Sequence, residues 1–220
     1  LGVFYDHAMD TMHSMGSGIG VASGLGVLTR LGLSTNVVAV AGDSTFFHAC
    51  IPGLINARHN NADLTFVILD NQTTAMTGFQ PHPGTSTEDE GLVQVSIEKL
   101  VRSIGVDQLV RVDGTDIPAL IDTFHNVVTS AGLKVVIVDS ICQLREKKIS
   151  EAADESQPVV VRADLCKGDT CRICVGQYSC PALSWDRERS KAFVLQDQCV
   201  GCGSCIDVCP YDAIQRGLTD

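Results

Sequence analysis

Four cysteines near the end of the chain have the spacing of iron–sulfur ligands. They occur as Cys199-x2-Cys202-x2-Cys205-x3-Cys209 and are followed by Pro210. Three thiolates separated by two residues each can bind three corners of one [4Fe–4S] cluster, while the fourth cysteine, which precedes a proline, points away and binds a second cluster. The pattern therefore predicts one such cluster and indicates a second one close to it.

A looser group of cysteines precedes this motif. Its spacing is Cys166-x4-Cys171-x2-Cys174-x5-Cys180, with longer gaps but the same terminal Cys-Pro pair. In each group the cysteine that precedes a proline is expected to bind the cluster of the other group, so the predicted ligand assignment is crossed. One cluster is then held by Cys199, Cys202, Cys205 and Cys180, and the other by Cys166, Cys171, Cys174 and Cys209. A single cluster beside a degenerate half-site is the alternative.

Zinc binding and disulfide bonds are the other uses of such a block. Zinc sites favour two separate C-x2-C pairs, whereas here three cysteines follow in succession. No basic segment followed by an apolar one opens the sequence, so no secretory signal is expected and disulfides are disfavoured. Of the ten cysteines, Cys50 and Cys142 stand apart and are interpreted as small buried residues.

Polar residues follow two apolar runs in the first part of the chain. The run at residues 37–41 leads into Gly42-Asp43-Ser44-Thr45, where Gly42 is expected to form a tight turn, and the run at residues 64–69 leads into Asp70-Asn71-Gln72-Thr73. Ligands of parallel α/β sheets bind at the carboxyl ends of strands. The N–H groups at the start of a following helix favour a phosphate there. A lone aspartate at this position could equally be a helix N-cap.

The second strand end gives Asp43 a partner. One strand–helix–strand unit separates Asp43 from Asn71, so neighbouring strands present a carboxylate and a carboxamide side by side. Hard oxygen ligands together with a diphosphate suit octahedral Mg²⁺, and the Thr73 carbonyl is a natural third ligand. The pattern therefore predicts a magnesium–diphosphate site.

The elements that position these residues alternate between strands and helices. Runs rich in Val, Ile and Leu lie at residues 37–41, 64–69, 108–112 and 135–138, and helix-length segments lie at 45–59, about 92–103 and 116–129. Asp116-Ile117-Pro118 combines an N-cap with a proline in the first turn. The glycine-rich segment 16–32 is also expected to be helical, with a neighbour or ligand close to its glycines. The predicted fold class is α/β, with a doubly wound, mainly parallel sheet.

The composition changes after a polar, charged segment at residues 147–158. We expect a first domain at residues 1–148, a linker at 149–158 and a small α+β domain at 159–220.

The net charge of -10 argues against nucleic acid or an anionic membrane as the main partner. No apolar run is long enough to span a membrane, and a cytoplasmic location is expected. The chain opens at Leu1 and is interpreted as part of a longer subunit.

The string that begins GDSTFFHAC at Gly42 and ends TTAMTGFQPHPGT at Thr85 resembles a known family. It is similar to the cofactor-binding domain of the alpha subunits of indolepyruvate:ferredoxin oxidoreductases, which are thiamine diphosphate-dependent 2-oxoacid:ferredoxin oxidoreductases. Those subunits end in a ferredoxin-like domain, so the resemblance covers nearly the whole chain as a C-terminal portion. It implies thiamine diphosphate, Mg²⁺ and two [4Fe–4S] clusters as cofactors.

The resemblance also implies site residues. It makes Asp43, Asn71 and Thr73 the Mg²⁺ ligands. His48 and His82 are candidates for a substrate or cofactor contact, and each has a structural alternative. No catalytic residue is assigned, because the activating glutamate of this family lies in a separate domain, and the chain alone is expected to bind clusters without turnover. The implied cofactor-binding residues are Gly16, Ser17, Gly42, Asp43, Ser44, Thr45, Asn71, Thr73, Thr74, Met76, Thr77 and Gly78.

The implied reaction is the oxidative decarboxylation of a 2-oxo acid, an arylpyruvate such as indolepyruvate, to an acyl-CoA. Electrons pass through the clusters to ferredoxin, and the other partners are a beta subunit and coenzyme A. The alternatives are a pyruvate- or 2-oxoglutarate-type ferredoxin oxidoreductase subunit and an electron-transfer module with a non-catalytic α/β scaffold. A non-redox thiamine decarboxylase would leave the clusters unexplained, and GSGIG at residues 16–20 is no dinucleotide fingerprint, since no strand precedes it.

Overall fold

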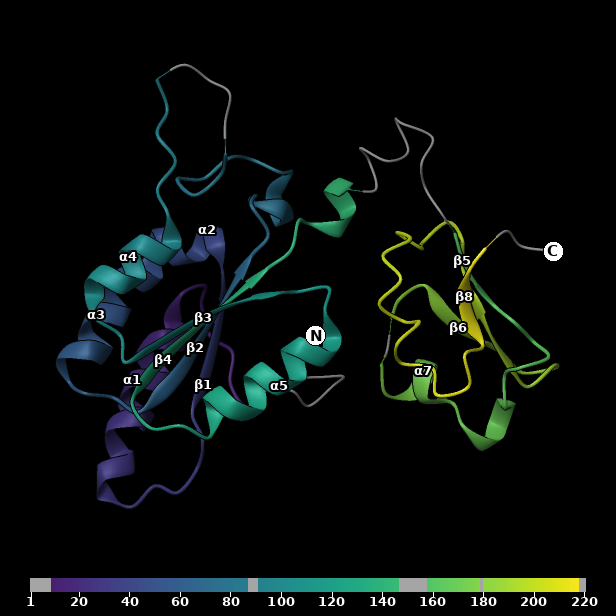
Figure 1. Ribbon diagram of the computed structural model, residues 1–220, viewed down its shortest axis with the longest axis horizontal. Coiled ribbons are helices and arrows are strands. Elements are labelled where there is room, and N and C mark those ends of the chain that lie inside the picture. Colours follow the sequence, from purple (N-terminus) through teal and green to yellow (C-terminus); the bar gives the residue numbers. More distant parts are fainter. Residues whose placement is uncertain (1–8, 87–90, 147–157, 179, 218–220) are drawn as a thin grey trace. The chain divides into compact units, whose positions relative to one another are not determined.

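The computed structural model describes residues 9–86, 91–146, 158–178 and 180–217. These residues form two compact units: one spans residues 11–142, and the other contains the described residues from Gln143 onward (Figure 1). Of the predicted linker, only Pro158 is described, and its carbonyl accepts a hydrogen bond from the Gly217 N–H at 3.0 Å. The rest of the predicted linker lies outside the described residues. In the part of the chain that is described, no helix is long and apolar enough to cross a membrane.

The first unit is built on one four-stranded parallel sheet (Figure 1). All four predicted strands are present, and the segments that join consecutive strands contain helices. The predicted α/β class with a parallel sheet is therefore confirmed. In spatial order the strands are β1 (Val38–Gly42), β2 (Leu64–Asp70), β4 (Leu133–Asp139) and β3 (Gln108–Asp113).

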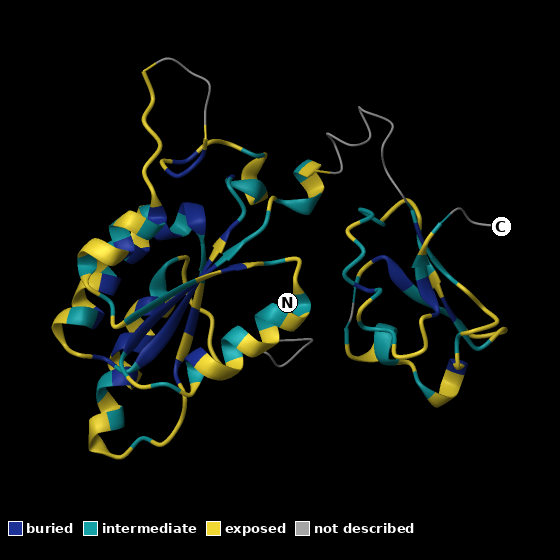
Figure 2. Cartoon of the chain, viewed as in Figure 1, coloured by how far each residue is buried: buried dark blue, intermediate teal, exposed yellow. Residues whose placement is uncertain are grey.

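Helices cover both faces of this sheet, as the doubly wound prediction requires. Side chains alternate between the faces along each strand, so Leu133 and Val135 of β4 belong to one core and Val136 to the other. Figure 2 shows the buried residues gathered on the strands and on the inner sides of the helices. One face packs against α1 (Ser17–Leu28), α3 (Ile51–His59) and α4 (Ile97–Ile104), and the other against α5 (Ile117–Val128).

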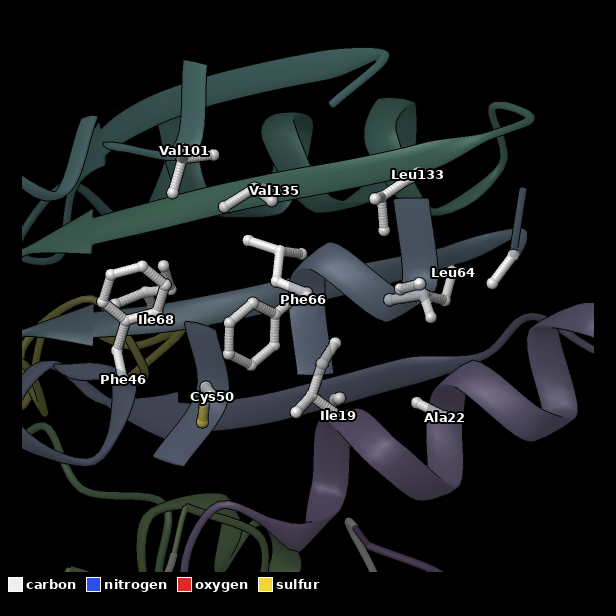
Figure 3. Packing of buried hydrophobic residues seen from close by; sticks show 14 of the residues in the cluster. Ile19, Ala22, Phe46, Cys50, Leu64, Phe66, Ile68, Val101, Leu133 and Val135 are labelled. Carbon is white, nitrogen blue, oxygen red and sulfur yellow. The ribbon is translucent and has the colours of Figure 1, made fainter. Parts of the chain in front are cut away.

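The larger core lies directly beneath the strand ends that carry the candidate site. Phe46, Phe66 and Ile68 are completely buried and Ile19 is 2% exposed, and Figure 3 shows these side chains packed together. Burial of each large apolar side chain contributes about 1.5–3 kcal/mol. Cys50 points into the same core and is also completely buried, as predicted for a small core residue.

Two predicted helix starts differ in outcome. The Asp116 carboxylate accepts a hydrogen bond from the Ala119 N–H at 3.0 Å, which confirms the N-cap of α5. Helix α4 begins later than predicted, because Ser96 caps it by accepting from the Lys99 N–H at 3.2 Å. The apolar residues that extended the prediction towards residue 92 lie exposed before the helix.

The helix after β1 contains a widened turn. The predicted helix at residues 45–59 is present as α2 (Asp43–Thr45), a π-helical turn (Phe46–Cys50) and α3. Pro52 has no N–H to donate to the carbonyl of His48 four residues earlier, so the regular ladder cannot continue through this point. Turns of this kind recur at functional sites, and this one follows Asp43 within one helical turn.

Helix α1 approaches the neighbouring backbone through a glycine. A Cβ on Gly26 would lie 2.7 Å from the carbonyl oxygen of Asp63, closer than real Cβ contacts come. A Cβ on Gly24, two residues earlier, would meet nothing within 4 Å. The predicted close approach is therefore confirmed at Gly26, whereas Gly24 has no such neighbour.

Substitution of these two glycines is expected to change stability in opposite directions. Gly26→Ala should lower the free energy of unfolding by about 1–3 kcal/mol, because the backbone at Asp63, just before β2 begins, must move. Gly24→Ala should raise it by about 0.5–1 kcal/mol through helix propensity alone. Denaturant titration followed by circular dichroism measures both effects. A shift of the same sign in both variants would contradict the close contact.

The second unit contains two short antiparallel pairs. β5 (Val159–Val161) pairs with β8 (Ile214–Arg216), and β6 (Leu183–Asp186) pairs with β7 (Lys191–Val194). A short helix, α7 (Ile173–Gly176), follows the first cysteines. The predicted strand near residue 159 is present. The core of this second unit contains few large apolar residues, and cysteine side chains pack into it.

Candidate functional site

The Asp43 carboxylate is buried at the carboxyl edge of the sheet and joins two strand ends. Its side chain is 2% exposed. Oδ1 accepts a hydrogen bond from the Ser44 N–H at 2.7 Å, and Oδ2 accepts one from the Gln72 N–H at 2.7 Å. The N-cap position of the following helix is Gly42. Asp43 therefore connects the end of β1 to the end of β2 instead of capping the helix.

The loop after β2 brings Asn71 and Thr73 to the same edge. Because β1 and β2 are neighbours in parallel register, their following residues meet there. The Asn71 side-chain oxygen accepts the Thr73 N–H at 3.1 Å, an Asx turn. Between them Gln72 has a φ of 61°, the left-handed conformation that side chains seldom adopt. The predicted proximity of the two strand ends is confirmed; Mg²⁺ coordination stays a prediction.

Hydroxyl groups line the same edge. The Thr74 hydroxyl donates to the Ser44 hydroxyl at 3.0 Å, so two of the residues implied for diphosphate binding touch. A hydrogen bond within the loop after β2 stabilises it, because the Thr77 hydroxyl donates to the Gln80 side-chain oxygen at 2.6 Å. Met76 is 90% exposed, and Gly78 ends the short helical turn with a φ of 111°.

The prediction of a tight turn at Gly42 is wrong. This residue has φ −74° and ψ 161°, an extended conformation open to any residue, because the strand continues into it and the chain turns only at the helix. A Cβ at Gly42 would meet nothing within 4 Å. The space beside the Gly42 backbone is compatible with a ligand approaching the main chain, but its contact with a diphosphate stays a prediction, as does that of half-buried Thr45.

The start of α1 lies against the turn that follows Asp43. A Cβ on Gly16, which has a φ of 82°, would be 2.4 Å from the Cβ of Ala49. The Ser17 hydroxyl donates to the Ser14 carbonyl at 2.7 Å. The structure thus brings the Gly16–Ser17 segment close to the helical segment that begins at Asp43, and the contact of Gly16 and Ser17 with the cofactor stays a prediction.

The two histidine candidates separate clearly. His48 is exposed on the π-helical turn. His82 is buried, and its Nε2 lies 3.0 Å from Asp43 Oδ2. Neither this pairing nor the Gln72 contact was predicted from the sequence, because no spacing rule links His82 or Gln72 to Asp43. The Pro-His-Pro-Gly string at residues 81–84 made His82 a candidate for a substrate or cofactor contact, with a rigid loop as the alternative, but it gave no link to Asp43.

The donors present fit a magnesium–diphosphate site. Asp43 supplies carboxylate oxygens, and each oxygen has two lone pairs, of which the Ser44 N–H takes one on Oδ1. Asn71 and Thr73 add side-chain and main-chain oxygens beside it, and hard oxygen donors are what Mg²⁺ selects. The buried carboxylate, the neighbouring hydroxyls and the open space at Gly42 together suit this group.

A separate ion cluster closes the same edge of the sheet at β2, β3 and β4. Arg111 Nη2 lies 3.1 Å from Asp70 Oδ2 and 2.6 Å from Asp139 Oδ2. Burial raises the pKa of Asp70, and the Arg111 charge opposes that rise. This cluster joins the ends of β2 and β4 to Arg111 within β3, and it gives Asp70 a structural role.

Four cysteines from two distant segments surround one cavity in the second unit. They are Cys166, Cys171, Cys174 and Cys209, and the last comes from the other cysteine motif. Burial, followed by the charges of the other three thiolates, raises the pKa of Cys174. The grouping agrees with the crossed assignment made from spacing.

The other four thiols of the second unit, those of Cys180, Cys199, Cys202 and Cys205, form the second group. Burial and then the neighbouring thiolates of Cys202, Cys180 and Cys199 raise the pKa of Cys205 to about 11. Cys180 therefore accompanies the motif that follows it in sequence. The Arg216 guanidinium braces this loop by donating to the carbonyls of Gly201 at 2.8 Å and Cys202 at 3.2 Å.

The thiols do not form a compact site for a single ion. Among the described residues, no three His, Cys, Asp or Glu side chains lie close enough to hold one metal ion. A zinc site needs thiolates about 2.3 Å from one point, whereas a cubane binds each thiolate at a different corner. All ten cysteines are free of disulfides. The arrangement fits [4Fe–4S] clusters.

Cys50 is expected to be unreactive in the folded protein. Burial raises its pKa to about 11, and the thiolate is the reactive form. At pH 8, iodoacetamide should label half-buried Cys142 well before Cys50, and peptide mass spectrometry measures the two separately. Equal labelling in the folded state would contradict the burial of Cys50.

Family comparisons agree with both units. The model of the thiamine pyrophosphate enzyme C-terminal TPP binding domain matches residues 4–123. The 4Fe-4S binding domain model matches residues 192–215. A ferredoxin of Methanothermococcus thermolithotrophicus is 40% identical over 57 residues, which are 26% of this chain and 92% of that protein.

Longer relatives share most of the chain. The indolepyruvate oxidoreductase subunit IorA of Pyrococcus abyssi is 40% identical over 82% of this chain, and that of Methanothermobacter marburgensis is 39% identical over 94%. The chain spans 28% and 32% of the length of these two relatives. Because one family model covers more than half of the chain and the ferredoxin is matched over nearly its whole length, the chain belongs to the thiamine pyrophosphate enzymes through their C-terminal TPP-binding domain and continues into a ferredoxin-type 4Fe-4S domain.

Proposed function

We propose that the chain is part of a thiamine diphosphate-dependent 2-oxoacid:ferredoxin oxidoreductase. The proposed reaction is the oxidative decarboxylation of an arylpyruvate such as indolepyruvate: carbon dioxide leaves, coenzyme A takes the acyl group, and two electrons pass to ferredoxin. The observation that carries this proposal is that one chain combines the strand-end site at Asp43 with two groups of four cysteines. A decarboxylase without redox chemistry needs no cysteine groups, and an electron-transfer module needs no buried carboxylate between two strand ends.

The residues at the sheet edge would hold the cofactor. Asp43, Asn71 and Thr73 are the proposed Mg²⁺ ligands. Ser44 and Thr74 present hydroxyls to the diphosphate, where the N–H groups at the helix start also favour an anion. When bound, thiamine diphosphate supplies the chemistry that decarboxylates a 2-oxo acid. The protein supplies the position and the charge of the groups around the cofactor.

The cysteine groups would carry the electrons. The proposed clusters are held by Cys199, Cys202, Cys205 and Cys180, and by Cys166, Cys171, Cys174 and Cys209. A [4Fe–4S] cluster carries one electron at a time, so two clusters can divide the electron pair released by one oxidation. The relatives are named as subunits, which supports a beta subunit as partner, with coenzyme A as the proposed acyl acceptor.

Turnover by the native protein that contains this chain tests the proposal. Indolepyruvate, pyruvate and 2-oxoglutarate are each supplied with thiamine diphosphate, Mg²⁺ and coenzyme A, and reduction of ferredoxin is followed by absorbance. We expect coenzyme A-dependent reduction with the arylpyruvate preferred. Preference for pyruvate or 2-oxoglutarate would overturn the substrate assignment. Absence of thiamine diphosphate binding would favour the electron-transfer module.

A further inference from the structure

The buried contact between His82 and Asp43 has no role in the function proposed above. The two side chains are 1% and 2% exposed, and His82 Nε2 lies 3.0 Å from Asp43 Oδ2. On the other side of the ring, Nδ1 accepts a hydrogen bond from the Gly84 N–H at 3.1 Å. An Nδ1 that accepts carries no proton, so this network assigns the ring proton to Nε2, the atom that faces the carboxylate.

The loop around His82 leaves its ring little freedom. The His82 N–H donates to the Thr85 hydroxyl at 3.0 Å, and that hydroxyl donates to the Gln72 carbonyl at 3.2 Å. The Phe47 ring lies 5.6 Å from the imidazole, centroid to centroid. A Cβ on Gly84 would be 2.6 Å from Phe47, so this glycine is needed for the packing. The imidazole is thus held from its backbone, its face and its Nδ1 edge.

His82 is the neighbour of the Asp43 carboxylate that comes from outside the two strand ends. The two hydrogen-bond donors to this carboxylate, the N–H groups of Ser44 and Gln72, belong to the main chain at those ends and are fixed by it. Nε2 is close to Oδ2 but not well aligned with it, and it makes no well-directed hydrogen bond in the described part of the chain. A buried donor in this situation costs free energy unless a nearby acceptor compensates it.

We propose that His82 is a positioning residue that fixes the Asp43 carboxylate for binding of Mg²⁺ and the diphosphate. This inference rests on the proposed function, in which Asp43 is a metal ligand. The loop that follows β2 thereby reaches back to the end of β1 and holds the ligand in place before the metal binds. Because its ring is 1% exposed and both nitrogens face protein groups, His82 acts through Asp43 and not on the substrate.

Two amide substitutions distinguish the contribution of the His82 Nε2 from that of its Nδ1. The side-chain amide nitrogen of His82→Gln can occupy the place of Nε2 and donate to Asp43. The shorter His82→Asn can replace Nδ1 with its oxygen and keep the Gly84 contact, but it cannot reach Asp43. His82→Ala removes both contacts. Partners that orient metal ligands typically affect metal affinity by about 10–100-fold, so His82→Asn and His82→Ala should weaken Mg²⁺ binding by about tenfold or more, and His82→Gln should stay within about threefold of wild type.

The test uses the native protein that contains this chain, with Mg²⁺ titrated calorimetrically at saturating thiamine diphosphate. The unfolding midpoint in EDTA without cofactor serves as the control, and Gln and Asn should shift it equally. Wild-type affinity in all three variants would overturn the proposal. Equal weakening in Gln and Asn would also overturn it, since the Nε2 donor would then not matter. If the wild-type protein binds no Mg²⁺ with the cofactor, the proposed function fails and this inference fails with it.

Discussion

Asp43→Ala is expected to abolish Mg²⁺-dependent binding of thiamine diphosphate and to leave the iron–sulfur clusters in place. The substitution removes the buried carboxylate that joins the ends of β1 and β2. Loss of a partner that merely orients a metal ligand costs about 10–100-fold in affinity, so loss of the ligand should cost about 100-fold or more. Calorimetric titration of the cofactor with and without Mg²⁺ measures the effect.

A second strand-end aspartate provides the matched control. Asp113 ends β3, and its carboxylate accepts hydrogen bonds from the N–H and hydroxyl of Thr115 at 2.8 and 2.7 Å. Asp113→Ala should therefore bind the cofactor as wild type does. Iron content and visible absorbance report the clusters in both variants. If Asp43→Ala lost clusters as well as cofactor binding, Asp43 would mainly support the fold.

Pairs of cysteine substitutions should distinguish the crossed ligand assignment from a sequential one. If each cluster takes its fourth ligand from the other motif, Cys166→Ala combined with Cys209→Ala damages one cluster and leaves about four irons per chain of the wild-type eight. Cys202→Ala combined with Cys209→Ala should damage both clusters and leave few irons. If each motif instead binds its own cluster, Cys166→Ala with Cys209→Ala damages both clusters, and Cys202→Ala with Cys209→Ala leaves about four irons. The measurement is iron and sulfide content after anaerobic reconstitution.

The structure supports the crossed outcome through the groups that the thiols form. Cys209 lines the cavity of Cys166, Cys171 and Cys174, while Cys180 raises the pKa of Cys205 together with Cys199 and Cys202. The first unit provides the control, since thiamine diphosphate binding should be unchanged in both double variants. About four irons in the wild-type chain would show that the looser motif holds no full cluster.

Local sequence was sufficient to place the strands of the first unit because each is a short run rich in Val, Ile and Leu. The central strands β2 and β4 are buried on both faces and are therefore apolar at most positions, whereas Val38 and Val40 of β1 are exposed. The start of α5 was also local, because Asp116 caps its own helix three residues ahead. The late start of α4 was missed, because exposed Leu92 and Val93 imitate a buried helix face.

Only part of the candidate site could be predicted from the sequence. Parallel strands end at the same edge, so the relation between Asp43 and Asn71 followed from topology alone. The Asp43 carboxylate accepts hydrogen bonds from the main-chain N–H groups of Ser44 and Gln72, and Gln72 needs a left-handed backbone for this contact. The third close neighbour of the carboxylate, the Nε2 of His82, comes from a separate loop. Backbone conformation and loop packing of this kind leave no periodic pattern.

The sequence by itself determined the α/β class and the four strands of the parallel sheet, because runs of apolar residues are local properties of the chain. The crossed cluster assignment, which was made from ligand spacing, stays a prediction. Only the tertiary structure decided that Asp43 joins two strand ends, that Gly42 stays extended and that His82 reaches Asp43 while His48 faces solvent. These features depend on contacts between residues far apart in sequence, and packing of the whole unit fixes them.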